Sequence, residues 1–174
     1  VIGFYGQDFA MKTGACGGWD IFGPERLITK SEGNILYELD HKPALELYKR
    51  YLGEEAKNLP FSGLYFPLAI WPQDQTEKAF VARTPLDINE DTQSITFAGD
   101  MPEGFKAQLM WGKFDSVTEG AGQAAREAFH ETLNEYETFS LLVSCLGRRA
   151  LLGQRIIHEV ELVTKVLGDK NKRL

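Results

Sequence analysis

Four short apolar stretches follow one another in the middle of the chain, with no helical pattern between them. Residues Pro, Asp, Asn and Gly separate them, which is typical of β-strands joined by turns. The stretches are Leu64–Trp71, Ala79–Arg83, Ser94–Phe97 and Lys106–Trp111. Strands that succeed one another without crossover helices favour antiparallel pairing. The sequence therefore predicts an α+β fold, with a mostly antiparallel or mixed β-sheet layer covered by three helices.

Helical spacing of apolar residues marks the three helices. Pro43 suits the first turn of a helix because proline lacks the N–H that would go unsatisfied there, and Gly53 suits its end. The second helix is expected over Gln123–Tyr136. The third is expected after Gly153, and its apolar stripe consists of Ile156, Val160, Val163 and Leu167.

Shorter apolar runs predict further strands. Val1–Tyr5 is typical of a strand end, and Arg26–Ile28 and Asn34–Leu39 lie on either side of a turn-like stretch, Lys30–Gly33. Phe139–Cys145 is apolar and shows no helical period, so we expect a buried strand there.

The residues after this last run form the best candidate for a binding site. The expected strand stops at Gly147, and Arg148 and Arg149 follow before the third helix. Backbone N–H groups of a turn, the positive end of a helix and bidentate arginines can each hold an anion. The structural alternative is that Cys145 belongs to the core and one arginine pairs with a neighbouring carboxylate.

Recognition of an amino acid needs a cation for the carboxylate and an acid for the ammonium, in an otherwise apolar pocket. Arg148 and Asp100 are candidates for the two charges, and Trp111 or Phe97 for the walls. The candidate ligand-binding residues are Arg148, Arg149, Asp100, Arg83 and Cys145. A structural Arg–Asp ion pair fits the same residues equally well.

Composition argues against several classes of protein. The net charge is −6. A nucleic-acid-binding surface normally needs a basic stripe, so this charge argues against such a surface. No apolar run reaches the roughly 18 residues of a membrane-spanning helix, and no signal-peptide pattern opens the chain. Cys16 and Cys145 form no C-x-x-C, so we expect reduced thiols in a cytoplasmic protein and no metal site.

Two motif-like stretches have simpler structural explanations. Gly120–Ala125 matches G-x-G-x-x-A, but polar residues precede it and Glu119 would repel a pyrophosphate. We expect instead that the glycines give the chain the freedom to turn into the second helix. Asp87–Asp91 lacks the turn glycine and the bidentate Glu of a calcium loop, so a hairpin loop is expected.

Nothing in the sequence predicts catalysis. The three histidines, His41, His130 and His158, form no H-E-x-x-H motif and no cluster with cysteine. No nucleophile elbow and no recognisable Ser/His/Asp set is present. We therefore expect a protein that is not an enzyme.

Four blocks of sequence, taken in order, resemble those of a known family. They are G-G-W-D-I-F-G-P-E-R at 17–26, N-I-L-Y-E-L-D-H-K-P-A-L-E-L-Y at 34–48, A-R-T-P-L-D-I-N-E-D-T-Q-S-I-T-F-A-G-D-M-P-E-G at 82–104 and S-C-L-G-R at 144–148. With them the chain resembles the FIST domain (F-box and intracellular signal transduction). Residues 1–40 resemble the end of the FIST N half with its connector, and residues 41–174 the FIST C half. The family's closing G-F-Y-x-x-G-E segment is not found after Leu167.

This resemblance implies a non-enzymatic, cytoplasmic sensory module that binds a small polar, amino-acid-like ligand in intracellular signal transduction. One alternative is a protein-interaction scaffold that uses Trp19, Phe22 and Trp71. The other is a haem-based nitric oxide sensor with His130 or His158 as the iron ligand. No other cofactor is expected.

The expected partners are a small-molecule ligand and other signalling proteins or domains, with no nucleic acid. Because parts of the family pattern are missing, we also expect an uncovered strand edge that recruits a second copy. Val1–Tyr5 and Leu64–Trp71 are the candidate edges of such a homodimer.

Overall fold

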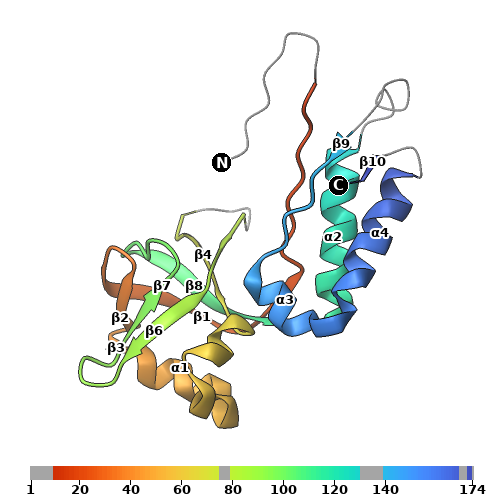
Figure 1. Cartoon of the computed structure of the whole chain (residues 1–174). Helices are drawn as coiled ribbons and strands as arrows, with labels where there is room; N and C mark the ends of the chain where they lie inside the picture. The colour runs from red at the N-terminus through yellow and green to blue at the C-terminus, as the bar shows by residue number, and fades with distance from the viewer. Residues whose placement is uncertain (1–9, 75–78, 130–138, 169–171, 174) are drawn as a thin grey trace.

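The fold is built on one large antiparallel sheet (Figure 1). The computed structural model describes residues 10–74, 79–129, 139–168 and 172–173. The strand order is β5 (Val81–Arg83), β4 (Leu68–Pro72), β8 (Phe105–Gly112), β1 (Trp19–Glu32), β2 (Ile35–Leu39), β7 (Ser94–Phe97) and β6 (Pro85–Asn89), and β3 (Lys42–Pro43) pairs with β2. Neighbouring strands in this sheet are antiparallel. The predicted α+β class is confirmed.

The long strand β1 lies at the centre of the sheet and bends within it. Its first part pairs with β8 and its last part with β2. The register shifts between Phe22 and Arg26, where Gly23 has a φ of 73° and Pro24 has no N–H to donate. Because of this break, β1 changes direction and pairs with β8 along its first part and with β2 along its last part, so the sheet curls around a core.

The helix α1 (Ala44–Leu52) fills the inside of the curled sheet. Pro43 precedes it and Gly53, with a φ of 58°, ends it, as the sequence predicted. Tyr48 is fully buried and its hydroxyl donates a 2.6 Å hydrogen bond to the carbonyl of Phe66. Burial raises the pKa of this hydroxyl well above its usual range, so it stays a neutral donor.

Asp40 ties the β2–β3 turn to β1. Its carboxylate accepts hydrogen bonds from Leu27 N–H at 2.8 Å and from the Arg26 guanidinium at 2.9 Å. Partial burial alone would raise the pKa of Asp40, but these donors outweigh it and hold the pKa below its ordinary value.

Three helices lie to one side of the sheet (Figure 1). Helices α2 (Phe114–Ala128) and α4 (Ile157–Leu167) pack against each other. The short helix α3 (Leu146–Leu152) and a 3₁₀ turn, Gly153–Ile156, lead into α4, and two further 3₁₀ turns follow α1 at Gly53–Asn58 and Phe61–Leu64. None of the helices in the described parts of the chain is long and apolar enough to cross a membrane.

Helix α2 begins at Phe114, well before the predicted start at Gln123. The expectation that Gly120–Ala125 relaxes a helix entry is therefore wrong, because these residues lie in the helix interior. An added Cβ at Gly120 would stand 2.9 Å from Gly18 Cα, and one at Gly122 would stand 2.8 Å from Leu162 Cδ2. The glycines are needed because α2 contacts the glycine-rich connector, residues 14–18, on one side and α4 on the other.

The predicted buried strand Phe139–Cys145 is also wrong. Only β9 (Phe139–Ser140) is a strand, paired in parallel with β10 (Lys172–Arg173), and α3 begins at Leu146. Leu141, Leu142 and Val143 are 54%, 45% and 87% exposed. An apolar run becomes a buried strand only where other elements cover both of its faces, and no such cover exists in the described parts of the chain.

The expected docking edge Leu64–Trp71 is corrected as well. Strand β4 starts at Leu68 and lies between β5 and β8, so it has no free edge. Trp71 is only 2% exposed, which also removes it from the expected interaction surface, and Trp19 and Phe22 are half-buried. The other expected edge, Val1–Tyr5, lies outside the described residues.

The expected hairpin loop Asp87–Asp91 lies at the connection between the antiparallel strands β6 and β7. Its first three residues, Asp87–Asn89, belong to the end of β6.

Substitution of Gly120 by alanine tests the close contact between α2 and the connector. Steric strain of about 1–3 kcal/mol should outweigh the gain of about 1 kcal/mol from removing a glycine inside a helix. We expect a loss of roughly 1–2 kcal/mol in the free energy of unfolding, measured by urea denaturation. Gly122→Ala is the matched control, because its Cβ meets side-chain atoms of Leu162 and Arg126 and no backbone, so it should cost less. A Gly120→Ala protein more stable than wild type would contradict the contact.

Substitution of Asp40 by asparagine tests the tie between the turn and β1. We expect a loss of about 1 kcal/mol in the free energy of unfolding at neutral pH, allowing for solvent screening. Since the pKa of Asp40 is lowered on folding, its contribution is present above about pH 4 and is lost as the pH falls through the folded-state pKa. The difference from wild type should therefore shrink in acid, whereas the exposed control Asp91→Asn should show no such difference.

Candidate functional site

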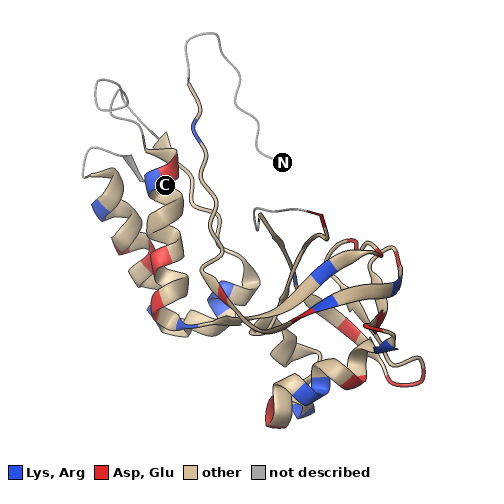
Figure 2. Ribbon diagram, turned by 180° about the vertical axis from the view of Figure 1, so that it is seen from behind, with Lys and Arg blue, Asp and Glu red and all other residues tan. Residues whose placement is uncertain are grey.

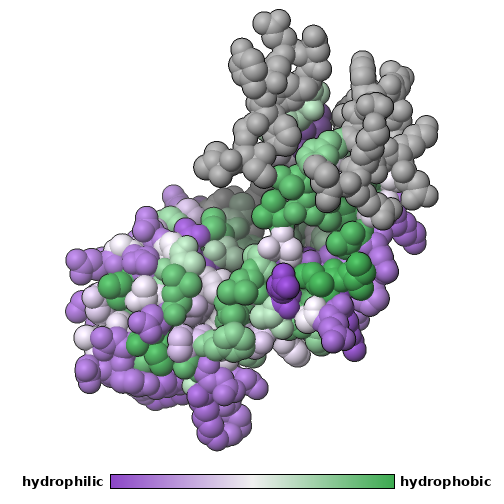
Figure 3. Space-filling model, in the orientation of Figure 1, coloured by the Kyte–Doolittle hydropathy of each residue, from purple (hydrophilic) through white to green (hydrophobic). Residues whose placement is uncertain are grey.

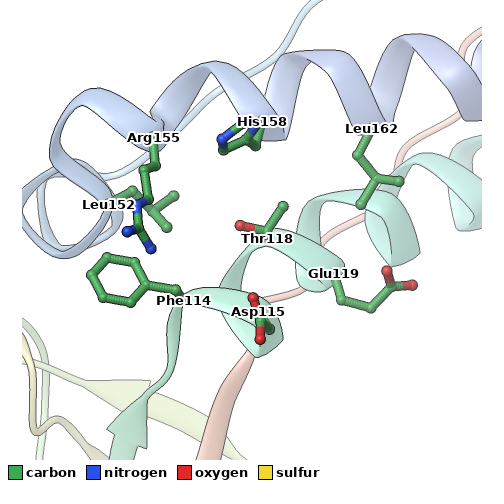
Figure 4. A pocket seen from close by; sticks show the side chains of 8 residues that line it. All are labelled: Phe114, Asp115, Thr118, Glu119, Leu152, Arg155, His158 and Leu162. Atoms are coloured by element: carbon green, nitrogen blue, oxygen red, sulfur yellow. The ribbon is translucent and has the colours of Figure 1, made fainter.

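A hollow of about 320 Å³ lies between α2 and the stretch from α3 to α4 (Figure 4). This volume is at the lower end of the range for small-molecule sites. Apolar walls and polar groups share the lining. The residues are Phe114, Asp115, Thr118, Glu119, Leu152, Arg155, His158 and Leu162.

Helical spacing brings the polar groups to this hollow. Asp115, Thr118 and Glu119 are three and four residues apart, so one face of α2 presents all of them. Across the hollow, Arg155 belongs to the 3₁₀ turn and His158 to the first turn of α4. Figure 4 shows Arg155 and His158 on one side of the hollow and Asp115 and Thr118 on the other, with the Glu119 carboxylate pointing along α2 away from Arg155.

Two opposite charges at the hollow are not neutralised by neighbours. The Arg155 guanidinium stands 4.8 Å from the centre of the Phe114 ring and has no carboxylate partner among the described residues. Asp115 has no cationic partner there either. Glu119, by contrast, pairs with Arg126, and His158 Nδ1 lies 3.0 Å from Glu161 Oε2. An unpaired cation facing an unpaired acid can receive a small molecule that bears both charges.

Arg148, the main residue of the predicted site, is a buried structural residue. Its Nε and Nη2 each lie 2.5 Å from Glu159 Oε1, and Nη1 donates to the carbonyls of Cys16 and Gly17 at 3.2 and 2.6 Å. Nη2 also donates to the carbonyl of Val117. The side chain is 8% exposed. Because these internal acceptors occupy the guanidinium, it has no donor left for a ligand.

The other predicted site residues fall into separate places. Arg83 donates from Nε to the carbonyl of Asp100 at 2.9 Å, so these two meet near the end of β5, through the backbone of Asp100 and not its carboxylate. Arg149 is exposed on α3. Cys145 is exposed at the N-cap of α3, where its Sγ accepts from Arg148 N–H at 3.4 Å.

The expected walls do not line the hollow. Phe97 is fully buried in the sheet core, and Trp111 is 46% exposed on β8. Of the two candidate haem ligands, His158 borders the hollow and His130 lies outside the described residues. Among the described residues, no three His, Cys, Asp or Glu side chains gather in a way that would hold a metal ion.

Comparison with known families decides the identity of the chain. Residues 44–172 match the FIST C domain, and residues 1–42 match the FIST N domain. The chain belongs to the FIST family. FIST domains are associated with sensory roles in signal transduction. No curated protein and no solved structure matches the chain.

Sequence reasoning about this FIST domain missed Arg155, Asp115 and Thr118. The signal for Asp115 and Thr118 was their helical spacing, but it was hidden because α2 was predicted to start after them. Arg155 follows Gly153 closely, as Arg148 follows Gly147. Only the neighbours in space distinguish the two arginines, since Glu159 neutralises one of them and no carboxylate neutralises the other.

Removal of the Arg148 side chain should destabilise this FIST domain strongly. Arg148→Met leaves the carboxylate of Glu159 buried without a counter-charge, which typically costs about 3–5 kcal/mol. Urea denaturation should show this loss, with Arg149→Met as the exposed control on the same helix, expected within about 0.5 kcal/mol of wild type. Adding Glu159→Leu to Arg148→Met should recover part of the loss. Equal stabilities of Arg148→Met and Arg149→Met would contradict the structural role of Arg148.

Proposed function

We propose that this FIST domain is a sensory module that binds a small zwitterionic ligand of the amino-acid type in the hollow between α2 and α4. The observation that supports this best is the pair of unneutralised charges, Arg155 and Asp115, on opposite sides of one cavity. The family's association with sensory roles supports the same function.

The proposed binding mode follows from the chemistry of the lining. Arg155 receives the ligand carboxylate through paired N–H donors, and Asp115 accepts the ammonium. The Thr118 hydroxyl adds a hydrogen-bonding group between them. Leu152 and Leu162 supply the apolar surface for the rest of the ligand.

The position of the hollow offers a route from binding to a signal. Helix α4 carries His158 and Leu162 on the hollow and Glu159 on the buried pair with Arg148. A ligand that draws α2 and α4 together would therefore act on the contacts of Arg148 with Cys16 and Gly17. This proposal moves the binding site from Arg148 to Arg155 and keeps Arg148 as the link to the connector.

Calorimetric titration with the common amino acids tests the proposal. Loss of a charge-assisted contact worth about 1.5–3 kcal/mol should weaken binding about tenfold to hundredfold in Arg155→Gln. Asp115→Asn should weaken it to a similar extent. Arg149→Gln removes an exposed arginine of α3 that does not line the hollow, so it should bind like wild type. If no amino acid binds, or if Arg155→Gln and Arg149→Gln bind alike, the proposed site is wrong.

A further inference from the structure

The segment Leu141–Cys145 is an exposed apolar segment of main chain between β9 and α3. Val143 is 87% exposed, and Leu141 and Leu142 are 54% and 45% exposed. Figure 3 shows apolar surface gathered where this segment and the neighbouring α3 lie, and Leu146 at the start of α3 is itself 70% exposed. An isolated exposed leucine is ordinary, but a run of adjacent exposed apolar residues marks an interaction surface.

Some backbone groups of this segment also have no hydrogen-bond partners among the described residues. Within the described parts of the chain, the N–H and C=O groups of Leu142 and Val143 take part in no hydrogen bond. The strand before it, β9, already pairs with β10, and the carbonyl of Cys145 accepts a bond from Arg149 N–H in α3. An extended chain with unpaired donors and acceptors is a template for another strand.

Charge indicates which strand can pair with it. Residues 139–146, F-S-L-L-V-S-C-L, contain no charged side chain, whereas the chain as a whole has a net charge of −6. Two copies have the same net charge, so they approach at least cost where charged side chains are absent. The edges of the large sheet are less suitable, because β6 contains Asp87 and β5 is a three-residue strand that contains Arg83. Figure 2 shows charged residues on the sheet and on the helices, whereas residues of this segment are tan, the colour of uncharged residues.

We propose that Leu141–Cys145 pairs with the same segment of a second copy, as two antiparallel strands related by a two-fold axis at Val143. In this register Val143 lies opposite the partner's Val143, Leu142 opposite the partner's Ser144, and Leu141 opposite the partner's Cys145. Every directly opposed pair is uncharged, so no like charges meet. The interface is isologous and closes on itself, which limits assembly to a dimer.

Light scattering with a charge substitution at the centre of the segment tests this dimer. Val143→Lys places two ammonium groups opposite each other, so we expect the variant to be a monomer where wild type is a dimer. The dissociation constant of the dimer should rise at least tenfold. Because Val143 is exposed in the single chain, this variant should keep the circular dichroism spectrum of wild type, and its melting temperature should fall only by the stabilisation that the dimer supplied. Leu86→Lys, at a 56% exposed position of β6, is the matched control and should remain a dimer. A monomeric wild type overturns the proposal and leaves the segment to a strand of another polypeptide, and a dimeric Val143→Lys overturns it as well.

Cross-linking tests the register separately. In a Cys16→Ser/Cys145→Ser background, Val143→Cys places the new thiol opposite its own copy, at a separation that a disulfide can bridge. Leu142→Cys faces the partner's Ser144 and lies diagonally from the other new thiol. Mild oxidation should therefore give several-fold more covalent dimer with Val143→Cys than with Leu142→Cys. Equal yields from the two positions overturn the two-fold strand pair.

Discussion

The buried pair of Arg148 and Glu159 is the interaction on which the helical part of the structure depends. A guanidinium and a carboxylate lose much hydration energy on burial, and the loss is offset only if the remaining donors are also satisfied. Arg148 meets this condition with the carbonyls of Cys16, Gly17 and Val117. One side chain of α3 thereby binds the connector before β1, helix α2 and helix α4 together.

Close backbone contact makes this arrangement possible. The connector must pass near α2 for its carbonyls to reach Arg148, and an added Cβ at Gly18 would stand 2.5 Å from Ser116 O. On the helix side, Gly120 removes the side chain that would block the approach. The aromatic ring of Trp19, which follows the connector, lies 6.0 Å from the Arg148 guanidinium and shields it further from water. Glycines on both elements and the buried arginine thus form one structural unit.

The same helices separate a structural arginine from one that remains open to a ligand. Arg148 and Arg155 each follow a glycine, and both are near α4. Glu159 points to the buried side of α4, while His158 beside it borders the hollow. Helix α4 therefore links the proposed ligand site to the contacts that hold the connector. A sensory module needs such a link, since a ligand can shift an equilibrium only through contacts that differ between two states.

The sequence by itself determined the elements whose signals are local. Pro43 and Gly53 bound α1, turn residues separate the strands, and consecutive strands made the antiparallel α+β class predictable. Tertiary structure decided what local pattern could not show. Phe139–Cys145 has the composition of a buried strand, yet burial depends on which elements cover it. Gly120 and Gly122 looked like a helix entry because the sequence does not show that a Cβ at Gly120 would meet the backbone of Gly18, or that one at Gly122 would meet the side chain of Leu162, within 3 Å. Arg148 and Arg155 have similar local sequence contexts, and only Glu159, which lies next to one of them in space, decides which arginine is structural and which stays free for a ligand.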